Sequence, residues 1–303
     1  MVNSEFQTAV LLALLNARPG GMSWSDIASE VALRGSASSV WDQHFPPQGG
    51  HSVDPDGHIA AGLAQLADWA EAHFSLLTVL DVDYPLALRE IHQLPPILFV
   101  KGRLDPGLLG VSVVGSRRAS ARGLDIAGRV ATGLTERDIV VLSGLAEGID
   151  TAAHVSTLAA GGRPVGVIGT GINKVYPARN RALHDDVAAT GALVSQFWPD
   201  APPTKQTFPM RNVTMSGLGR ASVVVEAQEI SGARIQARVA VEHGRPVVLC
   251  DHVVHNTDWA KGLIGRPGVY QAGTVEEILS VIDHILDMPV NAATMAPSLG
   301  DLG

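Results

Sequence analysis

The chain has 303 residues, a formal net charge of −8, 46% hydrophobic residues and a single cysteine. Such a chain can bury a large core, and its acidity excludes the coating of nucleic acid through overall positive charge. Cys250 cannot form an intramolecular disulfide, which indicates a reducing compartment and a plain thiol at a strand end. The longest apolar run, residues 9–15, is too short to span a bilayer and follows no basic segment, so we expect a cytoplasmic protein.

The first 75 residues predict a small helical domain. Apolar residues recur at helical spacing over 9–17 and again from Ile59 to Phe74. Between them, residues 23–35 begin with a serine and end with a glycine, which are start and stop signals for another helix. Residues 46–58 contain nothing to pack and are interpreted as a loop.

Residues 76–287 predict an α/β fold. Seven short apolar runs follow one another, and most are separated by segments of helical periodicity; they are "ILFV", "VSVVG", "IVVLSG", "VGVIGTG", "ALVS", "SVVVEA" and "PVVLC". Apolar strands that alternate with helices indicate a doubly wound, mainly parallel sheet covered on both faces. The last residues, 288–303, are poor in apolar side chains and are expected to form a flexible tail.

Unusual residues gather where the predicted strands end. In an open parallel sheet, ligands bind outside the carboxyl ends of the strands, near helix N-termini with unpaired N–H groups. Four loops of this kind occur, at residues 115–120, 143–150, 169–180 and 226–234. In any one loop the glycines could simply permit a tight turn. Four such loops on one edge favour a binding site.

The first of these loops, "GSRRAS", carries arginine where a dinucleotide-binding turn would carry more glycine. Ser116 and Ser120 are candidates to cap the helix that follows. Arg117 would extend its guanidinium across the sheet edge, which suits bidentate phosphate binding. The alternative for Arg117 is a surface ion pair with Glu147 or Asp150.

The second and third loops combine capping residues with residues suited to nucleotides. Asp150 is interpreted as the N-cap of a helix, and His154 as a helix histidine with its hydrogen bonds satisfied. The third loop holds two cations, an aromatic ring and an amide that suit stacking of a base beside a phosphate, namely Lys174, Arg179, Tyr176 and Asn180. Equally, the tyrosine could close the edge of the sheet.

Two later segments complete the predicted site. Arg211 and Asn212 lie in "FPMRN", which lacks clean periodicity and predicts a loop folded over the site. Ser231 and Gly232 begin a helix and could offer N–H groups to an anion. Arg238 stands four residues before Glu242, which indicates an exposed helix face. The histidines are scattered, and neither a nucleophile elbow nor a P-loop is present. We therefore expect no catalytic residue, metal site or cofactor.

These motifs, in this order, resemble the DNA-processing protein A (DprA/Smf) family. The matching segments are "VVGSRRASARG", "VVLSGLAEGIDTAAH", "GVIGTGINKVYPARN", "FPMRN" and "VVVEAQEISGARIQARVAVEHGRPV". The resemblance implies an extended Rossmann-like domain, usually dimeric, that binds single-stranded DNA and helps to load the RecA recombinase in transformation or repair. By position it implies a DNA- or phosphate-binding set of Gly115, Ser116, Arg117, Arg118, Gly144, Lys174, Tyr176, Asn180, Arg211, Asn212, Ser231 and Gly232.

The chain departs from the family pattern in several places. Val213 and Thr214 follow "FPMRN" where the family commonly has arginine and isoleucine, and the family's "SGSLITA" is "SGARIQA" here. We expect no C-terminal winged-helix domain of the kind that many members carry. These features describe a divergent member.

A second class of function is a sensor or hydrolase of a nucleotide-derived small molecule, for example in phage defence. The hydrolases that resemble this fold place a glutamate on the helix after a glycine-rich turn. Here that helix offers Arg234, Ile235 and Gln236, so no carboxylate is available to stabilise an oxocarbenium ion. Hydrolysis is therefore disfavoured, whereas sensing stays open.

Overall fold

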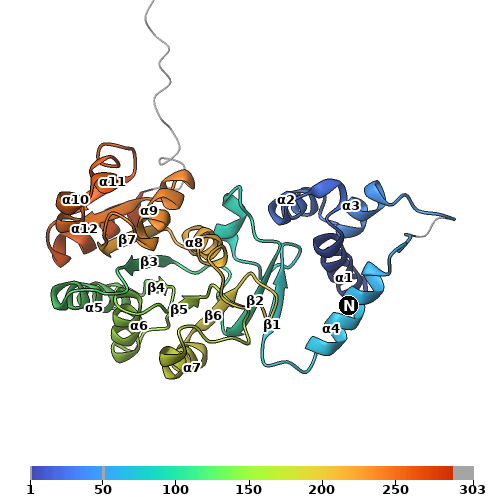
Figure 1. Cartoon of the computed structure of the whole chain (residues 1–303), viewed down its shortest axis with the longest axis horizontal. Coiled ribbons are helices and arrows are strands. Elements are labelled where there is room, and N and C mark those ends of the chain that lie inside the picture. The colour runs from blue at the N-terminus through green and yellow to red at the C-terminus, as the bar shows by residue number, and fades with distance from the viewer. Residues whose placement is uncertain (1, 50–51, 289–303) are drawn as a thin grey trace, which may run out of the picture.

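The structure is a computed structural model that describes residues 2–49 and 52–288. Four helices come first, α1 (Val2–Ala17), α2 (Trp24–Arg34), α3 (Ala37–His44) and α4 (His58–Trp69), with a 3-10 turn, η1 (Pro19–Gly21), after α1. They gather at one end of the molecule (Figure 1). Residues 9–15 of α1 are buried among them. The flexible tail expected from residue 288 onwards lies, from residue 289, outside the described residues.

The helix predicted from the serine and glycine signals is α2. The Ser23 side chain accepts a hydrogen bond from the Asp26 amide while the Asp26 carboxylate accepts one from the Ser23 amide, so both ends of a capping box are present. Gly35 ends the helix with φ of 64°, a left-handed conformation that favours glycine. The prediction of this helix is confirmed, whereas α3 was not predicted.

Nine strands form one sheet in the order β1-β2-β6-β5-β4-β3-β7-β8-β9. Their bounds are β1 (Ser75–Thr78), β2 (Ile97–Gly102), β3 (Gly110–Gly115), β4 (Val140–Ser143), β5 (Val165–Val167), β6 (Ala192–Ser195), β7 (Ala221–Glu226), β8 (Val247–Cys250) and β9 (Val269–Ala272). From β6 to β9 neighbouring strands are parallel, while β2 pairs antiparallel with β1 and β6. All seven predicted runs are strands, and the mainly parallel sheet is confirmed. The short strands β1 and β9 were not predicted.

Helices cover both faces of the sheet. Figure 1 shows α5 (Ala121–Thr135), α6 (Ile149–Ala159) and α7 (Arg181–Thr190) on one side, and α8 (Thr207–Leu218) and α9 (Gly232–Glu242) on the other. The remaining helices are η2 (Leu86–Glu90), η3 (Ala178–Asn180), α10 (Asp251–Asn256), α11 (Asp258–Lys261) and α12 (Val275–Asp287), of which α12 packs on α5. Covered on both sides, the strands need apolar residues at every position, which explains their unbroken apolar runs.

The strand order reverses between β3 and β7. From β3 the chain continues to β4, β5 and β6 on one side, whereas β8 and β9 follow β7 on the other. At such a switch point the loops leave in opposite directions and open a crevice at the carboxyl ends of the strands. Gly115 ends β3 and Glu226 ends β7, so both lie at the rim of this crevice.

Two further findings concern single features. No helix among residues 2–49 and 52–288 is long and apolar enough to cross a membrane. Cys250 ends β8 as a buried free thiol, as predicted, and burial raises the pKa of this thiol to about 12.

Candidate functional site

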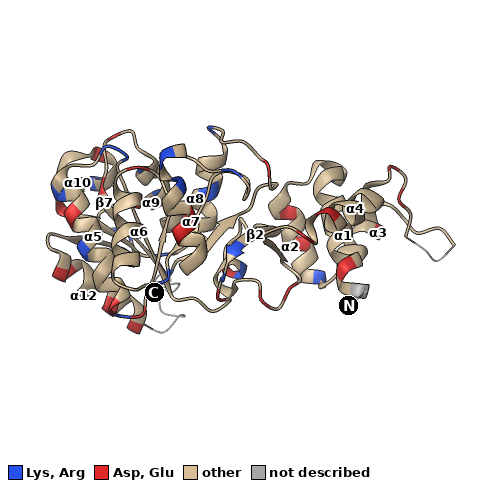
Figure 2. Cartoon of the chain, turned by 90° about the horizontal axis from the view of Figure 1, so that it is seen from below, with Lys and Arg blue, Asp and Glu red and all other residues tan. Residues whose placement is uncertain are grey.

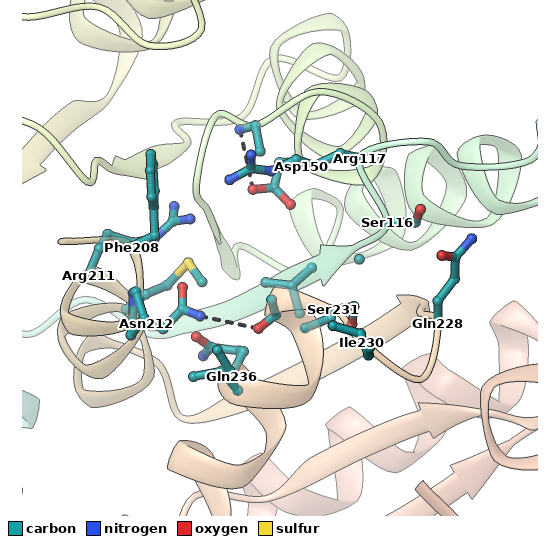
Figure 3. A pocket seen from close by; sticks show the side chains of 18 of the residues that line it. Ser116, Arg117, Asp150, Phe208, Arg211, Asn212, Gln228, Ile230, Ser231 and Gln236 are labelled. Atoms are coloured by element: carbon teal, nitrogen blue, oxygen red, sulfur yellow. Dashed lines mark hydrogen bonds between the residues drawn. The ribbon is translucent and has the colours of Figure 1, made fainter. Parts of the chain in front are cut away.

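A pocket of about 330 Å³ opens at the switch point between β3 and β7. Figure 3 shows its walls: Ser116 and Arg117 come from the β3–α5 loop, Phe208, Arg211 and Asn212 from α8, and Gln228, Ile230, Ser231 and Gln236 from the β7–α9 segment. A smaller pocket adjoins it and shares Arg117, Phe208 and Arg211. Residues of all four predicted loops line one pocket or the other.

The β3–α5 loop is tied to the end of β7. The Ser116 amide donates to the Glu226 carbonyl at 2.7 Å, and the Ser120 amide and hydroxyl both donate to the Glu226 carboxylate. Ser120 also caps α5, as predicted, by accepting from the Gly123 amide at 3.0 Å. The N-terminus of α5 is thus already closed by the chain's own carboxylate, and an anion has to bind through other groups of the loop.

Arg117 and Arg118 are those groups. Both side chains are exposed, and neither makes an ion pair within 4 Å among the described residues. The Arg117 guanidinium lies 5.3 Å from the centre of the Phe208 ring, a cation–π arrangement that holds it at the mouth of both pockets. The alternative pairing with Glu147 does not form, because Glu147 pairs with Arg179 at 3.2 Å.

Asp150 does not cap α6. The N-cap is Gly148, and the Asp150 carboxylate accepts from the amides of Gly144 at 3.1 Å and Ala146 at 3.4 Å. Asp150 therefore closes the turn before the helix, and the N-cap interpretation is wrong because its side chain reaches back to amides freed by that turn. Burial raises the pKa of Asp150, and the nearby charge of Arg211 opposes the rise.

Arg211 and Asn212 lie on helix α8, so the expectation of a loop is wrong. Arg211 is only 6% exposed and donates from Nη1 to the Val167 carbonyl at 2.8 Å. A Cβ atom on Gly144 would overlap the Arg211 guanidinium, which explains the glycine at that position. Burial lowers the pKa of Arg211, and the charge of Asp150 opposes this. Arg211 is therefore a buried residue of the pocket wall, whereas Arg117 is exposed.

Asn212 joins α8 to α9. Its Nδ2 donates to the Gly232 carbonyl at 3.3 Å (Figure 3). Ser231 caps α9 by accepting from the Arg234 amide, and a Cβ atom on Gly232 would meet nothing within 4 Å. The first turn of α9 therefore faces open space at the pocket, as an anion site at a helix N-terminus requires.

The β5–α7 segment contributes unevenly. Tyr176 is 40% exposed, and its ring centre lies 5.4 Å from that of Phe208. Asn180 instead donates to the Leu145 carbonyl and the Thr151 hydroxyl and supports the β4–α6 turn. Lys174 pairs with Asp200 at 3.3 Å beyond the pocket walls. Tyr176 therefore lines the smaller pocket, whereas the Asn180 side chain holds the neighbouring turn.

Phe208 is a residue of the site that the sequence did not lead us to assign. It stands between the Arg117 guanidinium and the Tyr176 ring and lines both pockets. Its position in the quoted "FPMRN" motif was the available signal. Ile230, also unassigned, is 92% exposed at the rim of the larger pocket. Within the described residues, no group of three or more His, Cys, Asp or Glu side chains is arranged to hold a metal ion.

The fold and the site together define a doubly wound Rossmann-like protein with an arginine- and aromatic-lined pocket at its switch point. The sequence model of the family described as DNA recombination-mediator protein A matches residues 75–278. The chain belongs to this family, and the resemblance inferred from the motifs is confirmed.

Individual relatives agree with this assignment. The chain is 43% identical over 177 residues to the DNA processing protein DprA of Streptococcus pneumoniae (strain ATCC BAA-255 / R6), an alignment that covers 57% of this chain and 62% of that protein. The X-ray structure of DprA from Streptococcus pneumoniae superposes with a TM-score of 0.66 at 30% identity, covering 91% of this chain and 95% of that one. DNA processing protein A from Helicobacter pylori shares the fold, with a TM-score of 0.61 at 21% identity over 70% of this chain and 97% of that one.

Proposed function

We propose that the protein binds single-stranded DNA at the switch-point pocket and acts as a recombination mediator. The observation that carries the proposal is Arg117, an exposed guanidinium that has no acidic partner within the part of the chain that the structure describes and is held against Phe208 at the mouth of both pockets. The family to which the chain belongs is described as a recombination mediator. The Helicobacter pylori relative was solved to explain its single-stranded DNA binding mode.

The pocket offers the two kinds of contact that an unpaired strand needs. Arg117, Arg118 and the open first turn of α9 supply donors for phosphate oxygens. Phe208 and Tyr176 offer ring surface on which a base can stack, a contact that tolerates any sequence. In a duplex the bases are stacked on one another, so these rings would favour a single strand.

Charge is distributed to suit this role. Figure 2 shows Lys and Arg beside α8 and α9, whereas Asp and Glu predominate on α1–α4. Residues 1–74 contain Arg18 and Arg34 against eight acidic side chains. An acidic protein has no diffuse positive field, so the few cations at the sheet edge would provide most of the affinity.

We infer a binding role without chemical catalysis. Asp150 is the one acid among the described residues that line the larger pocket, and its carboxylate is engaged by the Gly144 and Ala146 amides. A buried and occupied carboxylate is poorly placed to serve as a general base.

Further parts of the role extend beyond the matched region. The chain spans 62% of the length of the Streptococcus pneumoniae relative. The proposal also includes RecA loading, action in transformation or repair, a cytoplasmic location and separate folding of residues 1–75 and 76–287. It includes a homodimer as well, and sedimentation at micromolar concentration tests this, since a monomer mass would contradict it.

Arg117→Ala tests the proposed site. Removing this charge-assisted hydrogen-bond donor should weaken binding to labelled oligothymidine by about 1–3 kcal/mol and reduce the salt slope by about 0.7. Arg238→Ala is the matched control, because Arg238 pairs with Glu242 at 3.3 Å on the exposed face of α9. Fluorescence anisotropy at several salt concentrations measures both quantities. If Arg117→Ala binds as the parent does while folded, the site is wrong, and native mass spectrometry for a bound nucleotide becomes the next measurement.

A further inference from the structure

The segment after β6, residues 196–201, connects the N-terminal helices with the loop that carries Lys174. On one side Trp198 joins an aromatic cluster: its ring centre lies 5.3 Å from that of Trp24 at the start of α2 and 6.1 Å from that of Trp69 at the end of α4. Phe99 of β2 lies 6.4 Å away. Trp198 is therefore held by both the helices and the sheet.

The other side of the same segment holds the β5–α7 loop through its backbone. The Asn173 amide donates to the Pro199 carbonyl at 2.9 Å, and the Gly171 amide donates to the Ala201 carbonyl at 2.9 Å. A Cβ atom on Gly171 would come within 2.2 Å of the Trp198 carbonyl oxygen, so the two segments are in direct contact. The side chain of Lys174 then pairs with Asp200.

These contacts differ in strength. The Lys174–Asp200 pair is 46% and 73% exposed, and exposed pairs of this kind contribute little to fixing a loop. Residues 168–177 form no helix or strand of their own. The backbone hydrogen bonds and the aromatic contacts of Trp198 must therefore fix where this loop lies.

We infer that Lys174, which lies outside the pocket walls two residues before Tyr176 of the smaller pocket, contacts the DNA backbone beyond the pocket. Trp198 is then a positioning residue through which the N-terminal helices set the place of Lys174. The inference rests on the proposed function. The acidic helices are unsuited to bind phosphate themselves, so a contribution from them has to be indirect. Trp24 and Trp69 provide the route, because they touch the segment that holds the loop.

The experiment compares Trp198→Leu with Trp198→Phe in the full chain, each alone and with Lys174→Ala. Binding to oligothymidine is measured across salt concentrations, and amide exchange of residues 171–174 is followed in the free protein. Trp198→Leu should weaken binding about threefold to tenfold, reduce the salt slope by up to about 0.7, and speed exchange of the Gly171 and Asn173 amides. In the Lys174→Ala background it should have less than about a twofold effect.

Trp198→Phe and two further variants sharpen the test. Trp198→Phe keeps a ring in the cluster and should retain most of the affinity. Trp24→Leu, made on the helical side, should act in the same direction as Trp198→Leu. Asp200→Asn removes only the ion pair and should leave the exchange of residues 171–174 unchanged.

The outcomes separate this inference from the proposed function. Failure of the parent to bind oligothymidine would overturn the proposed function and, with it, the role of Lys174. With binding intact, an equal loss from Trp198→Leu in both backgrounds, or unchanged exchange of residues 171–174 in Trp198→Leu and Trp24→Leu, would overturn the inference alone.

Discussion

The residue types of the site could be predicted from the sequence, but how deeply each side chain is buried could not. Arg117 and Arg211 both stand in motifs that indicate phosphate binding, yet the first is exposed and the second is only 6% exposed. The difference arises because Gly144 leaves space into which the Arg211 guanidinium fits. Such space depends on the packing of α8 against the sheet, which a linear pattern does not record.

Gly148 should be the least replaceable glycine of the site. Its φ is 77°, and a Cβ atom there would lie 2.2 Å from the Ser116 carbonyl oxygen. Gly161 has the same φ with nothing within 4 Å and is the control for a positive φ, while the ψ of Gly148 is −122°. We expect Gly148→Ala to cost about 1–3 kcal/mol more stability than Gly161→Ala, and to weaken DNA binding as well. Urea unfolding and anisotropy measure the two effects; equal stabilities would contradict the contact.

Because of His154, we expect the free energy of unfolding to decrease as the pH falls below 6.5. His154 is fully buried on α6, and neither ring nitrogen makes a hydrogen bond within 3.5 Å among the described residues, although the nearby Ser143 backbone favours its charged form. Burial lowers the pKa of His154 from 6.5 to about 4. Below pH 6.5 the unfolded chain binds a proton that the folded chain rejects until about pH 4, which costs up to about 3 kcal/mol.

Urea unfolding at pH 7 and pH 4.5 tests this prediction. His154→Gln should lose less stability between the two pH values than the parent loses. His73→Gln, at an exposed histidine, controls for the substitution itself. An unchanged pH dependence in His154→Gln would remove His154 as the cause.

At the scale of elements, strands were easier to predict than α8. Seven strands are buried on both faces and therefore form unbroken apolar runs, whereas β1 and β9 are partly exposed edge strands of four residues each. Helix α8 is buried around most of its last two turns, so it has no polar face and no visible period. Pro209 lies in the first turn of this helix, where no backbone donor is needed.

Because the Glu226 carboxylate occupies the N-terminus of α5, we expect its neutralisation to strengthen DNA binding. The carboxylate lies at the N-terminus of a helix, beside the loop that carries Arg117 and Arg118. Glu226→Gln removes one negative charge from this edge and weakens the interaction with the helix dipole. We expect stability to fall by up to about 1 kcal/mol and oligothymidine to bind more tightly. Ser120→Ala, which removes the cap without changing charge, is the control; tighter binding in both variants would contradict the electrostatic reason.

At the scale of the whole molecule, the negative charge is concentrated in the N-terminal helices. Residues 1–74 hold two basic against eight acidic side chains, so the remainder is nearly balanced at a net charge of −2. These counts follow from the sequence, but the sequence does not show that Trp24 and Trp69 of the acidic helices contact Trp198.

This distribution of charge predicts where salt dependence originates. Arg118→Ala, at the pocket, should reduce the salt slope of oligothymidine binding by about 0.7. Arg34→Ala, on the acidic helices, should leave the slope unchanged, because Arg34 pairs with Glu30 far from the sheet edge. A slope reduced equally by both variants would mean that the strand also follows the helices.

The two outermost strands limit how copies of the chain can associate. β1 and β9 offer four residues each, so a strand added beside either would gain few backbone hydrogen bonds. Short edges of this kind protect a sheet against edge-to-edge aggregation, and they make β-augmentation a poor route to a dimer. We therefore expect self-association to proceed without strand pairing at β9, so the exchange rates of the amides in residues 269–272 should not change with protein concentration.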